Sequence, residues 1–285
     1  MANTAMASSR AAALATALLF VVMFEVGVVR GQLQVGFYSD SCPDAEDVVT
    51  AAVQDAAGND PTILPALLRL QFHDCFVKLA DALSVHECLH QTGGPAFDIP
   101  TGRRDGLTSN LRDADALPDA DDPIDSLRSR FAAAGLTDRD LVLLTAAHTV
   151  GTTACFFVKD RLYNFPLGAG RRGADPSIPA PFLAELKSRC APGDLNTRLP
   201  LDRGSEARFD DSILRNIRSG QAVIASDAAL VAGNATRAIV DAYLGAAARR
   251  FQKDFADAMV RMGSIGAITG DDGEVRDVCS AFNSN

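Results

Sequence analysis

The sequence predicts a mostly α-helical protein with a minor β-hairpin, on three observations. Apolar residues recur at three- to four-residue spacing through most of the long segments, which is the period of an amphipathic helix. Hydrophobic residues make up 47% of the chain but aromatic residues only 6%, so aliphatic side chains must fill the core. The one strand-like signal is a pair of short apolar runs around the turn sequence GDDG, within 268–275.

The chain is acidic, with a formal net charge of −9 at pH 7. Such a charge repels nucleic-acid phosphates and anionic lipid headgroups, so we expect no nucleic-acid partner and no membrane-surface role. Beyond the N-terminal run described next, no apolar segment is long enough to cross a bilayer, and no membrane span is expected.

The N-terminus has the layout of a secretory signal peptide. Arg10 precedes an apolar run over 11–24, which Glu25 interrupts and which is too short to span a membrane comfortably. We therefore assign 1–31 as a signal peptide and 32–285 as the mature, secreted domain. Secretion would place the six cysteines in an oxidising compartment, where disulfides persist.

Two helices are predicted in the first part of the mature chain. Ser41 is a candidate N-cap for an amphipathic helix over 43–57. The segment 61–77 is apolar on most faces, which predicts a buried helix. Glycine and proline punctuate 79–105, so we expect irregular structure there. The Asp-rich stretch 113–125 predicts a solvated loop.

The second half is predicted to be more regular. Thr137 is placed to cap a helix that runs through LVLLTAAHTV and ends at Gly151. Leu141, Leu144 and His148 recur at helical spacing within it. The GDDG turn predicts the small hairpin at 268–275. Further helices are predicted at 178–189, 210–218, 235–247 and 248–262.

Two histidines lie in chemically informative surroundings. Arg69 and His73 are four residues apart and so project from one helix face. An imidazole can move a proton while a fixed guanidinium stabilises developing charge. His148 ends an apolar helix, where a neutral imidazole is a good iron ligand if an acceptor holds its second nitrogen. Taken alone, each pattern fits a structural histidine better.

Several sequence blocks together resemble the secreted plant haem peroxidases, the class III family. The resemblance includes LLRLQFHDCFV, GGPAFDIPTGRRDG and GLTDRDLVLLTAAHTVG, in that order. It implies a haem-peroxidase-like helical fold and an extracellular monomer of the cell wall. The implied reaction reduces hydrogen peroxide at haem b and oxidises small phenolic donors by one-electron steps. The matching blocks are 37–46, 67–77, 93–106, 135–151, 161–165, 201–210, 225–227 and 258–279.

The resemblance also implies roles for individual residues. His73 matches the distal histidine that moves a proton between the peroxide oxygens, and Arg69 matches the arginine that stabilises the charge of O–O cleavage. His148 matches the axial iron ligand, and Asp227 the carboxylate that accepts its second ring N–H. Pro118 matches the proline beside the reducing substrate.

The same resemblance implies calcium on the proximal side of the haem. The residues that match its ligands offer the hard oxygen atoms that calcium prefers. They are Thr149, Asp202, Ser205, Asp210 and the carbonyl of Arg208. A second, distal calcium site keeps only Asp74, the carbonyl of Val77 and Asp81 of the family's pattern.

The chain departs from the family after Val77. The family continues with a block that holds further distal-side helices and the asparagine that orients the distal histidine. Here the sequence reads KLADALSVHECLHQ and rejoins the pattern at TGGP, so 79–91 form an aberrant junction. We expect His73 to be held less firmly as a result.

The cysteines depart in the same way. The resemblance implies a disulfide between Cys155 and Cys190. Each native bridge that the chain lacks removes ~2–5 kcal/mol of stability. A competing hypothesis is therefore a truncated relative of the family that is catalytically impaired or does not bind haem. The cysteines without an assigned partner are Cys42, Cys75, Cys88 and Cys279.

Two further motifs remain. His86, Glu87 and His90 spell HExxH, the pattern of zinc peptidases. A zinc peptidase is disfavoured because Ala96 occupies the position of a third ligand. Asn234 begins an N-x-T sequon, a candidate glycosylation site in a secreted chain.

Overall fold

The structure is a computed structural model that describes residues 33–77, 83–108, 110–278 and 281–283. The predicted signal peptide, Asp81 and Cys279 lie outside the described residues. The described chain is mostly helical, as predicted, and its strands are short. None of the described helices is both long and apolar enough to cross a membrane.

The first two predicted helices are confirmed as α2 (Ala45–Asn59) and α3 (Ile63–Val77). The predicted N-cap at Ser41 is wrong. Asp44 precedes the first helical residue, and its side chain makes no capping hydrogen bond. The interior of α3 is apolar, and Leu68 and Phe76 are buried in the main core.

A third helix, α4 (Leu83–Gln91), corrects the prediction of irregular structure across 79–105. The helix packs against both α2 and α3, and its Cys88 and Leu89 are buried. Its sequence mixes polar and apolar residues, so tertiary packing rather than intrinsic propensity stabilises it. The segment after α4, from 94 to 100, is irregular as expected.

The predicted cap at Thr137 is confirmed. Its hydroxyl accepts a hydrogen bond from the backbone N–H of Asp140, and the Asp140 side chain accepts from the backbone N–H of Thr137. This reciprocal capping box starts α6 (Asp138–Thr145). The helix then tightens into the 3₁₀ turn η2 (Ala146–Thr149), so His148 lies in a 3₁₀ turn rather than in the α-helix.

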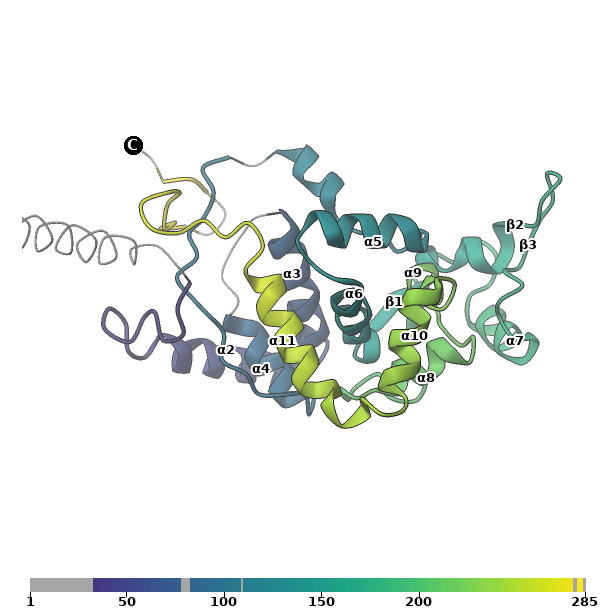
Figure 1. The fold of residues 1–285 in the computed structure, drawn as a ribbon, viewed down its shortest axis with the longest axis horizontal. Coiled ribbons are helices and arrows are strands. Elements are labelled where there is room, and N and C mark those ends of the chain that lie inside the picture. The colour runs from purple at the N-terminus through teal and green to yellow at the C-terminus, as the bar shows by residue number, and fades with distance from the viewer. Residues whose placement is uncertain (1–32, 78–82, 109, 279–280, 284–285) are drawn as a thin grey trace, which may run out of the picture.

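Helix α6 lies at the centre of the main core (Figure 1). Leu141, Val142 and Leu143 are at most 1% exposed. Helices α5 (Ile124–Ala133), α10 (Asn234–Tyr243) and α11 (Phe251–Gly263) pack around it. Helix α5 begins inside the stretch that was predicted to be a loop, which also holds most of the 3₁₀ helix η1 (Leu111–Ala116).

The remaining helical predictions agree with the structure to within a few residues, but three short helical elements were not predicted. The 210–218 prediction is α8, 235–247 is α10, and 248–262 is η5 followed by α11. These three are η3, η4 and α9, and α9 follows a loop over 219–224. The elements not yet named are η3 (Cys155–Phe157), the π-helical turn η4 (Asp160–Asn164), α7 (Ala180–Arg189), α8 (Ser212–Arg218), α9 (Ala225–Ala229) and η5 (Ala248–Arg250).

The β-strands form in other segments than the predicted 268–275. Strand β1 (Thr152–Ala154) pairs antiparallel with β4 (Arg198–Pro200). Strands β2 (Phe165–Pro166) and β3 (Arg172–Gly173) form a hairpin that projects from one end of the molecule (Figure 1). The hairpin predicted at 268–275 does not form, because Glu274 instead bridges to Asp105, far away in sequence.

The predicted disulfide between Cys155 and Cys190 is present, and it lies in a second hydrophobic cluster. Among the described residues, three cysteines are free. Cys42 is exposed, whereas Cys75 and Cys88 are buried. Burial raises the pKa of the Cys88 thiol to about 12, which makes it unreactive at neutral pH.

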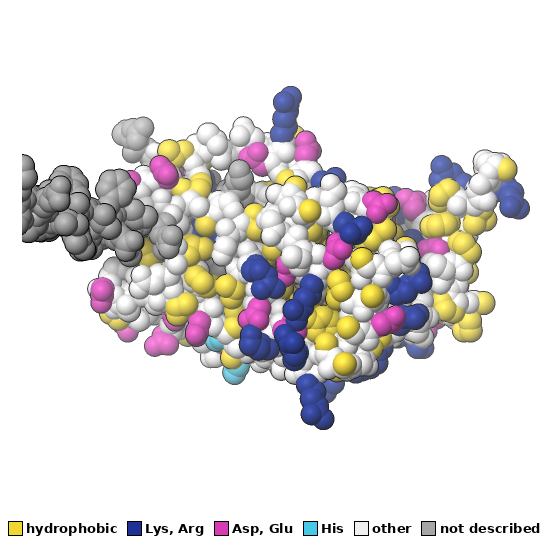
Figure 2. Space-filling model, viewed as in Figure 1, with side chains coloured by type: hydrophobic (Ala, Val, Ile, Leu, Met, Phe, Trp, Pro, Cys, Tyr) yellow, Lys and Arg dark blue, Asp and Glu magenta, His cyan; other side chains and the backbone are white. Residues whose placement is uncertain are grey.

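Basic side chains on the face in Figure 2 are interspersed with acidic ones. Arg218 pairs with Asp241 at 2.5 Å, and Lys253 pairs with Asp257 at 2.7 Å. Exposed pairs of this kind contribute ~1 kcal/mol or less each. This face therefore carries mixed charge rather than a large patch of one sign.

Candidate active site

A cavity of about 240 Å³ lies between α3 and the α6–η2 segment. Most of its lining residues are apolar, and α3, α5, α6 and α11 each contribute to it. Four residues that the sequence analysis singled out line this one cavity, although they lie far apart in the chain. They are Arg69, His73, Pro118 and His148.

A hydrogen bond with Asp227 holds the ring of His148 in place. The Nδ1 atom of His148 lies 2.8 Å from Oδ1 of Asp227, and the Asp227 side chain is fully buried. With Nδ1 engaged, Nε2 is the ring nitrogen that remains for a ligand. Burial lowers the pKa of His148, but the charge and hydrogen bond of Asp227 outweigh it and raise the pKa above its ordinary value.

A buried arginine holds the loop that leads to Asp227. Arg161 pairs with Asp175 at 2.8 Å, and its Nη1 donates to the carbonyls of Ala222, Val223 and Ile224 at 2.6, 3.1 and 3.2 Å. Helix α9 begins directly after these carbonyls and carries the aspartate. This network orients the carboxylate toward His148 although Arg161 itself does not line the cavity.

The opposite wall carries Arg69 and His73 on α3. Nε of Arg69 donates a hydrogen bond of 3.2 Å to Nε2 of His73. That bond requires an unprotonated Nε2, so the neutral ring carries its proton on Nδ1. Burial, and then the charge of Arg69, lower the pKa of His73. The Arg69 charge also acts to lower the pKa of His148, as expected if the two walls face each other.

The rim of the cavity includes residues that the sequence analysis did not single out. Phe157 of η3 and Asp119 line it, as does Arg198 of β4. Phe157 lies two residues after the disulfide-bonded Cys155, and no other feature of the sequence next to it pointed to this position. Arg198 reaches the rim only because β4 pairs with β1, a contact that no local pattern in the sequence predicts.

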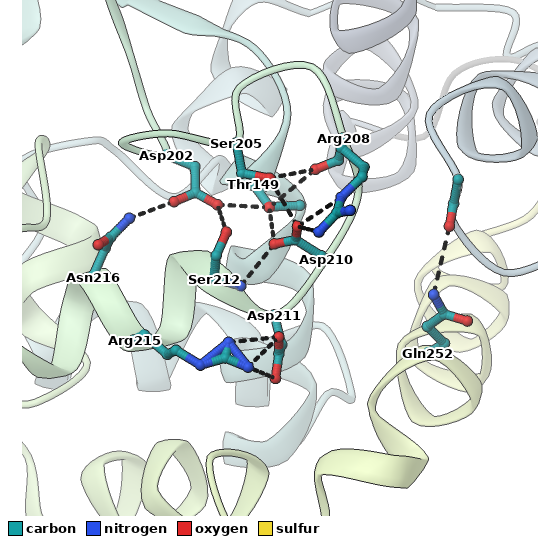
Figure 3. Close-up of polar contacts among 11 residues, drawn as sticks. Thr149, Asp202, Ser205, Arg208, Asp210, Asp211, Ser212, Arg215, Asn216 and Gln252 are labelled. Carbon is teal, nitrogen blue, oxygen red and sulfur yellow. Dashed lines mark hydrogen bonds and ion pairs between the residues drawn. The ribbon is translucent and has the colours of Figure 1, made fainter.

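The five residues predicted for proximal calcium come together around Thr149, the residue that follows His148 in the chain (Figure 3). The Thr149 hydroxyl donates to Asp202 at 2.7 Å, and the Ser205 hydroxyl donates to Asp210 at 2.8 Å. Both hydroxyls also lie 3.4 Å from the carbonyl oxygen of Arg208. Two carboxylates, two hydroxyls and a carbonyl are the hard oxygen donors that suit calcium.

Further side chains orient the two carboxylates. Ser212 donates to Asp202 at 2.5 Å and Asn216 donates to it at 2.6 Å (Figure 3). Burial raises the pKa of Asp202. Burial would also raise that of Asp210, but hydrogen bonds from Ser212, Arg208 and Ser205 outweigh it and lower the pKa to about 2. Neither Ser212 nor Asn216 was predicted from the sequence.

The residues predicted for distal calcium are only partly described. Asp74 and Val77 lie near the end of α3, and Asp81 falls outside the described residues. Burial raises the pKa of Asp74 to about 6, against the opposing charge of Arg103. This set of ligands stays a prediction.

The HExxH motif has a structural role in α4. Glu87 is buried and accepts hydrogen bonds from Gln54 at 3.0 Å and Gln91 at 2.9 Å, while His90 is exposed. No group of three or more His, Cys, Asp or Glu side chains among the described residues is arranged to hold a metal ion. The proximal calcium set is not a group of this kind, because only two of its five residues, Asp202 and Asp210, are carboxylates.

Comparisons with known proteins agree with this geometry. The family model described as "Peroxidase" matches residues 79–246, which include His148, Asp227 and the proximal calcium set. The match begins at 79, the residue at which the predicted aberrant junction starts.

Curated relatives extend the match over α3. Peroxidase 43 of Arabidopsis thaliana is 42% identical over 94% of this chain and 97% of its own length. Peroxidase 13 of the same plant is 39% identical over 94% of this chain and 99% of its own length. Peroxidase N1 of Nicotiana tabacum is 36% identical over 93% of this chain and 96% of its own length.

The alignment to Peroxidase 43 runs over 320 positions, more than the 285 residues of the chain. This relative therefore has residues for which the chain has no counterpart, as the internal deletion requires. The identity nevertheless extends over nearly the full length of each relative, together with the family match across more than half of the chain. The chain therefore belongs to the plant peroxidase family of class III and is a haem peroxidase that acts on hydrogen peroxide.

Proposed function

We propose that the peroxidase reaction takes place in the cavity between His73 and His148, with haem b held by His148. The observation that carries this proposal is the opposition of two polar pairs across one apolar cavity. Arg69 and His73 lie on one wall, and His148 backed by Asp227 lies on the other. A flat, largely apolar group fits between such walls.

The proximal pair suits an iron ligand. The Nδ1–H group of His148 would donate a hydrogen bond to Asp227, which leaves Nε2 as the donor atom and makes the imidazole more electron-rich. The haem would supply the iron that binds peroxide and takes part in electron transfer. The chain's own contribution on this side is to orient the imidazole and to set its basicity.

His73 would handle the protons of the reaction. Its Nε2 is unprotonated in the neutral ring and accepts a hydrogen bond from Arg69. Hydrogen peroxide would replace this contact and give a proton to Nε2 from one oxygen. The same nitrogen then returns the proton to the other oxygen, which leaves as water.

Arg69 would stabilise the departing oxygen. Negative charge develops on that oxygen as the O–O bond breaks, and a fixed guanidinium in a poorly solvated cavity lowers the energy of this charge. Small phenols would be oxidised near Pro118 at the rim. One hydrogen peroxide takes two electrons and two protons from two phenols, which yields two waters and two phenoxyl radicals.

Calcium would stabilise the proximal side. Its proposed ligand Thr149 directly follows His148, so an ion there would hold the η2 turn in place. A resident cation would also neutralise the two facing carboxylates, Asp202 and Asp210. We further propose that the mature chain works as an extracellular monomer, as the class III family does.

The experiment is to express the mature chain through a secretory route with haem and calcium. Purified wild-type protein should show a Soret band and oxidise guaiacol only when hydrogen peroxide is present. The His148→Ala variant should lose the band. A folded wild-type protein without a Soret band and without guaiacol oxidation would refute the proposal.

A further inference from the structure

Arg198 occupies a position at the cavity rim that the proposed reaction does not use. It is the first residue of β4, and it pairs with Ala154 of β1 in the antiparallel register. Thr152, Thr153 and Ala154 of β1 line the same part of the cavity. The strand pair thus brings a cation from a distant part of the chain to the mouth of the proposed haem site.

The guanidinium is held along one edge. Nε of Arg198 donates to Oγ1 of Thr152 at 2.9 Å, and Nη2 donates to the carbonyl oxygen of Thr152 at 2.7 Å. These two bonds occupy the N–H groups on the Nε side of the planar group. The opposite edge, formed by Nη1 and the second hydrogen of Nη2, makes no hydrogen bond within the described part of the chain.

This cation also has no ion-pair partner among the residues that the structure describes. Asp119 lines the same cavity but forms no ion pair with it, and its carboxylate instead accepts a hydrogen bond from the backbone N–H of Asp121. A guanidinium fixed on one edge and open on the other is prepared for a bidentate carboxylate, because little side-chain entropy remains to be lost.

The apolar lining of the cavity argues for the same ligand. Its lining residues are mostly apolar, whereas Arg198 is exposed, and an ionised carboxylate is costly to bury among apolar side chains. A ligand with a flat apolar body and a carboxylate would therefore place the carboxylate at the rim. Both ligands of the proposed function can have this form, since haem b carries two propionate groups and many phenolic donors are acids.

We propose that Arg198, held by Thr152, is a carboxylate receptor at the mouth of the active-site cavity. This inference rests on the proposed function and extends it to the recognition of an acidic ligand. The carboxylate can belong to the porphyrin or to a phenolic acid donor, and one variant distinguishes the two. In Arg198→Gln the backbone pairing of β1 with β4 is retained and the charge is lost.

The first measurement titrates apo-protein with haem and, separately, with haem dimethyl ester, followed by absorbance. The second compares KM for ferulate with KM for its neutral analogue coniferyl alcohol. If the porphyrin is the source, Arg198→Gln raises the dissociation constant of haem about tenfold or more, but not that of the ester. If the donor is the source, it raises KM for ferulate alone by a similar factor.

The controls separate charge recognition from damage. Arg198→Lys keeps the positive charge but cannot donate two parallel hydrogen bonds to a carboxylate, so its effect on binding should be intermediate. Arg171→Gln removes an exposed arginine from the turn between β2 and β3 and should change nothing. The inference is overturned if Arg198→Gln changes the dissociation constants of haem and its dimethyl ester equally and the KM values for ferulate and coniferyl alcohol equally. It is also overturned if none of these four quantities changes. A wild-type chain that binds neither haem nor donor would overturn the proposed function as well.

Discussion

Nδ1 of His148 lies 2.8 Å from Oδ1 of Asp227, a carboxylate with no exposed surface. Its other oxygen, Oδ2, is also buried and has no hydrogen-bond partner among the described residues. The aspartate therefore has His148 as its one described side-chain partner. Such a contact sets the tautomer and basicity of the imidazole.

The first prediction concerns this contact directly. Asp227→Asn keeps the shape of the side chain and removes its charge, so His148 becomes a weaker donor to iron. We expect peroxide-dependent guaiacol oxidation to fall by about 10- to 100-fold. The matched control is Asp271→Asn, on an exposed turn. Equal activity of Asp227→Asn and wild type would show that the contact is only structural.

The second prediction concerns pH. Burial and the charge of Arg69 lower the pKa of His73 below 6.5, and the proposed reaction needs this ring neutral. The rate of reaction with peroxide should be constant above neutral pH and fall as pH drops through a midpoint below 6.5. Stopped-flow rates measured from pH 4 to pH 8 give the midpoint.

A partner variant tests the cause of that shift. Arg69→Leu removes one of the two effects that lower the pKa of His73, so its midpoint should move upward although the rate itself falls. A wild-type midpoint above 6.5, or a downward shift in Arg69→Leu, would contradict the assignment.

The third prediction concerns calcium. Chelation should lower the melting temperature, because an ion that binds only the folded state contributes about 2.7 kcal/mol at a concentration of about 100 times its Kd. Asp210→Asn should weaken this calcium dependence. Asp211→Asn is the matched control, because this neighbour pairs with Arg215 and lies outside the ligand set (Figure 3). A melting temperature that chelation leaves unchanged would argue against bound calcium.

The fourth prediction concerns the disulfide. Replacing both Cys155 and Cys190 by alanine should lower the free energy of unfolding by about 2–5 kcal/mol, measured by denaturant titration. Cys42→Ala should have little effect, because this cysteine is exposed and unpaired. A loss of similar size in both variants would mean that the bridge is not the source of the stability.

The sequence predicted the helices that carry the site because their signals are local. The capping box of Thr137 and Asp140 and the apolar period of α6 both depend on residues that are close together in the chain. The spacing of Arg69 and His73 likewise places them on one face of α3. Their meeting with His148 followed only from the family resemblance.

The predictions that failed depend on contacts between distant segments. The hairpin at 268–275 is absent because Glu274 pairs with Asp105, and α4 forms where it can pack against α2 and α3. Arg198 and Asn216 reach their sites through β-pairing and through the fold of the loop around Asp202. No periodic pattern marks such residues in advance.

The central claim is that His73 moves the proton of peroxide in a cavity where His148 holds the haem. Its most direct test is the second-order rate of reaction with hydrogen peroxide, followed at the Soret band in wild type and in His73→Leu at pH 7. We predict that the variant retains the Soret band and reacts at least about 100-fold more slowly. Equal rates in the two proteins would contradict the claim.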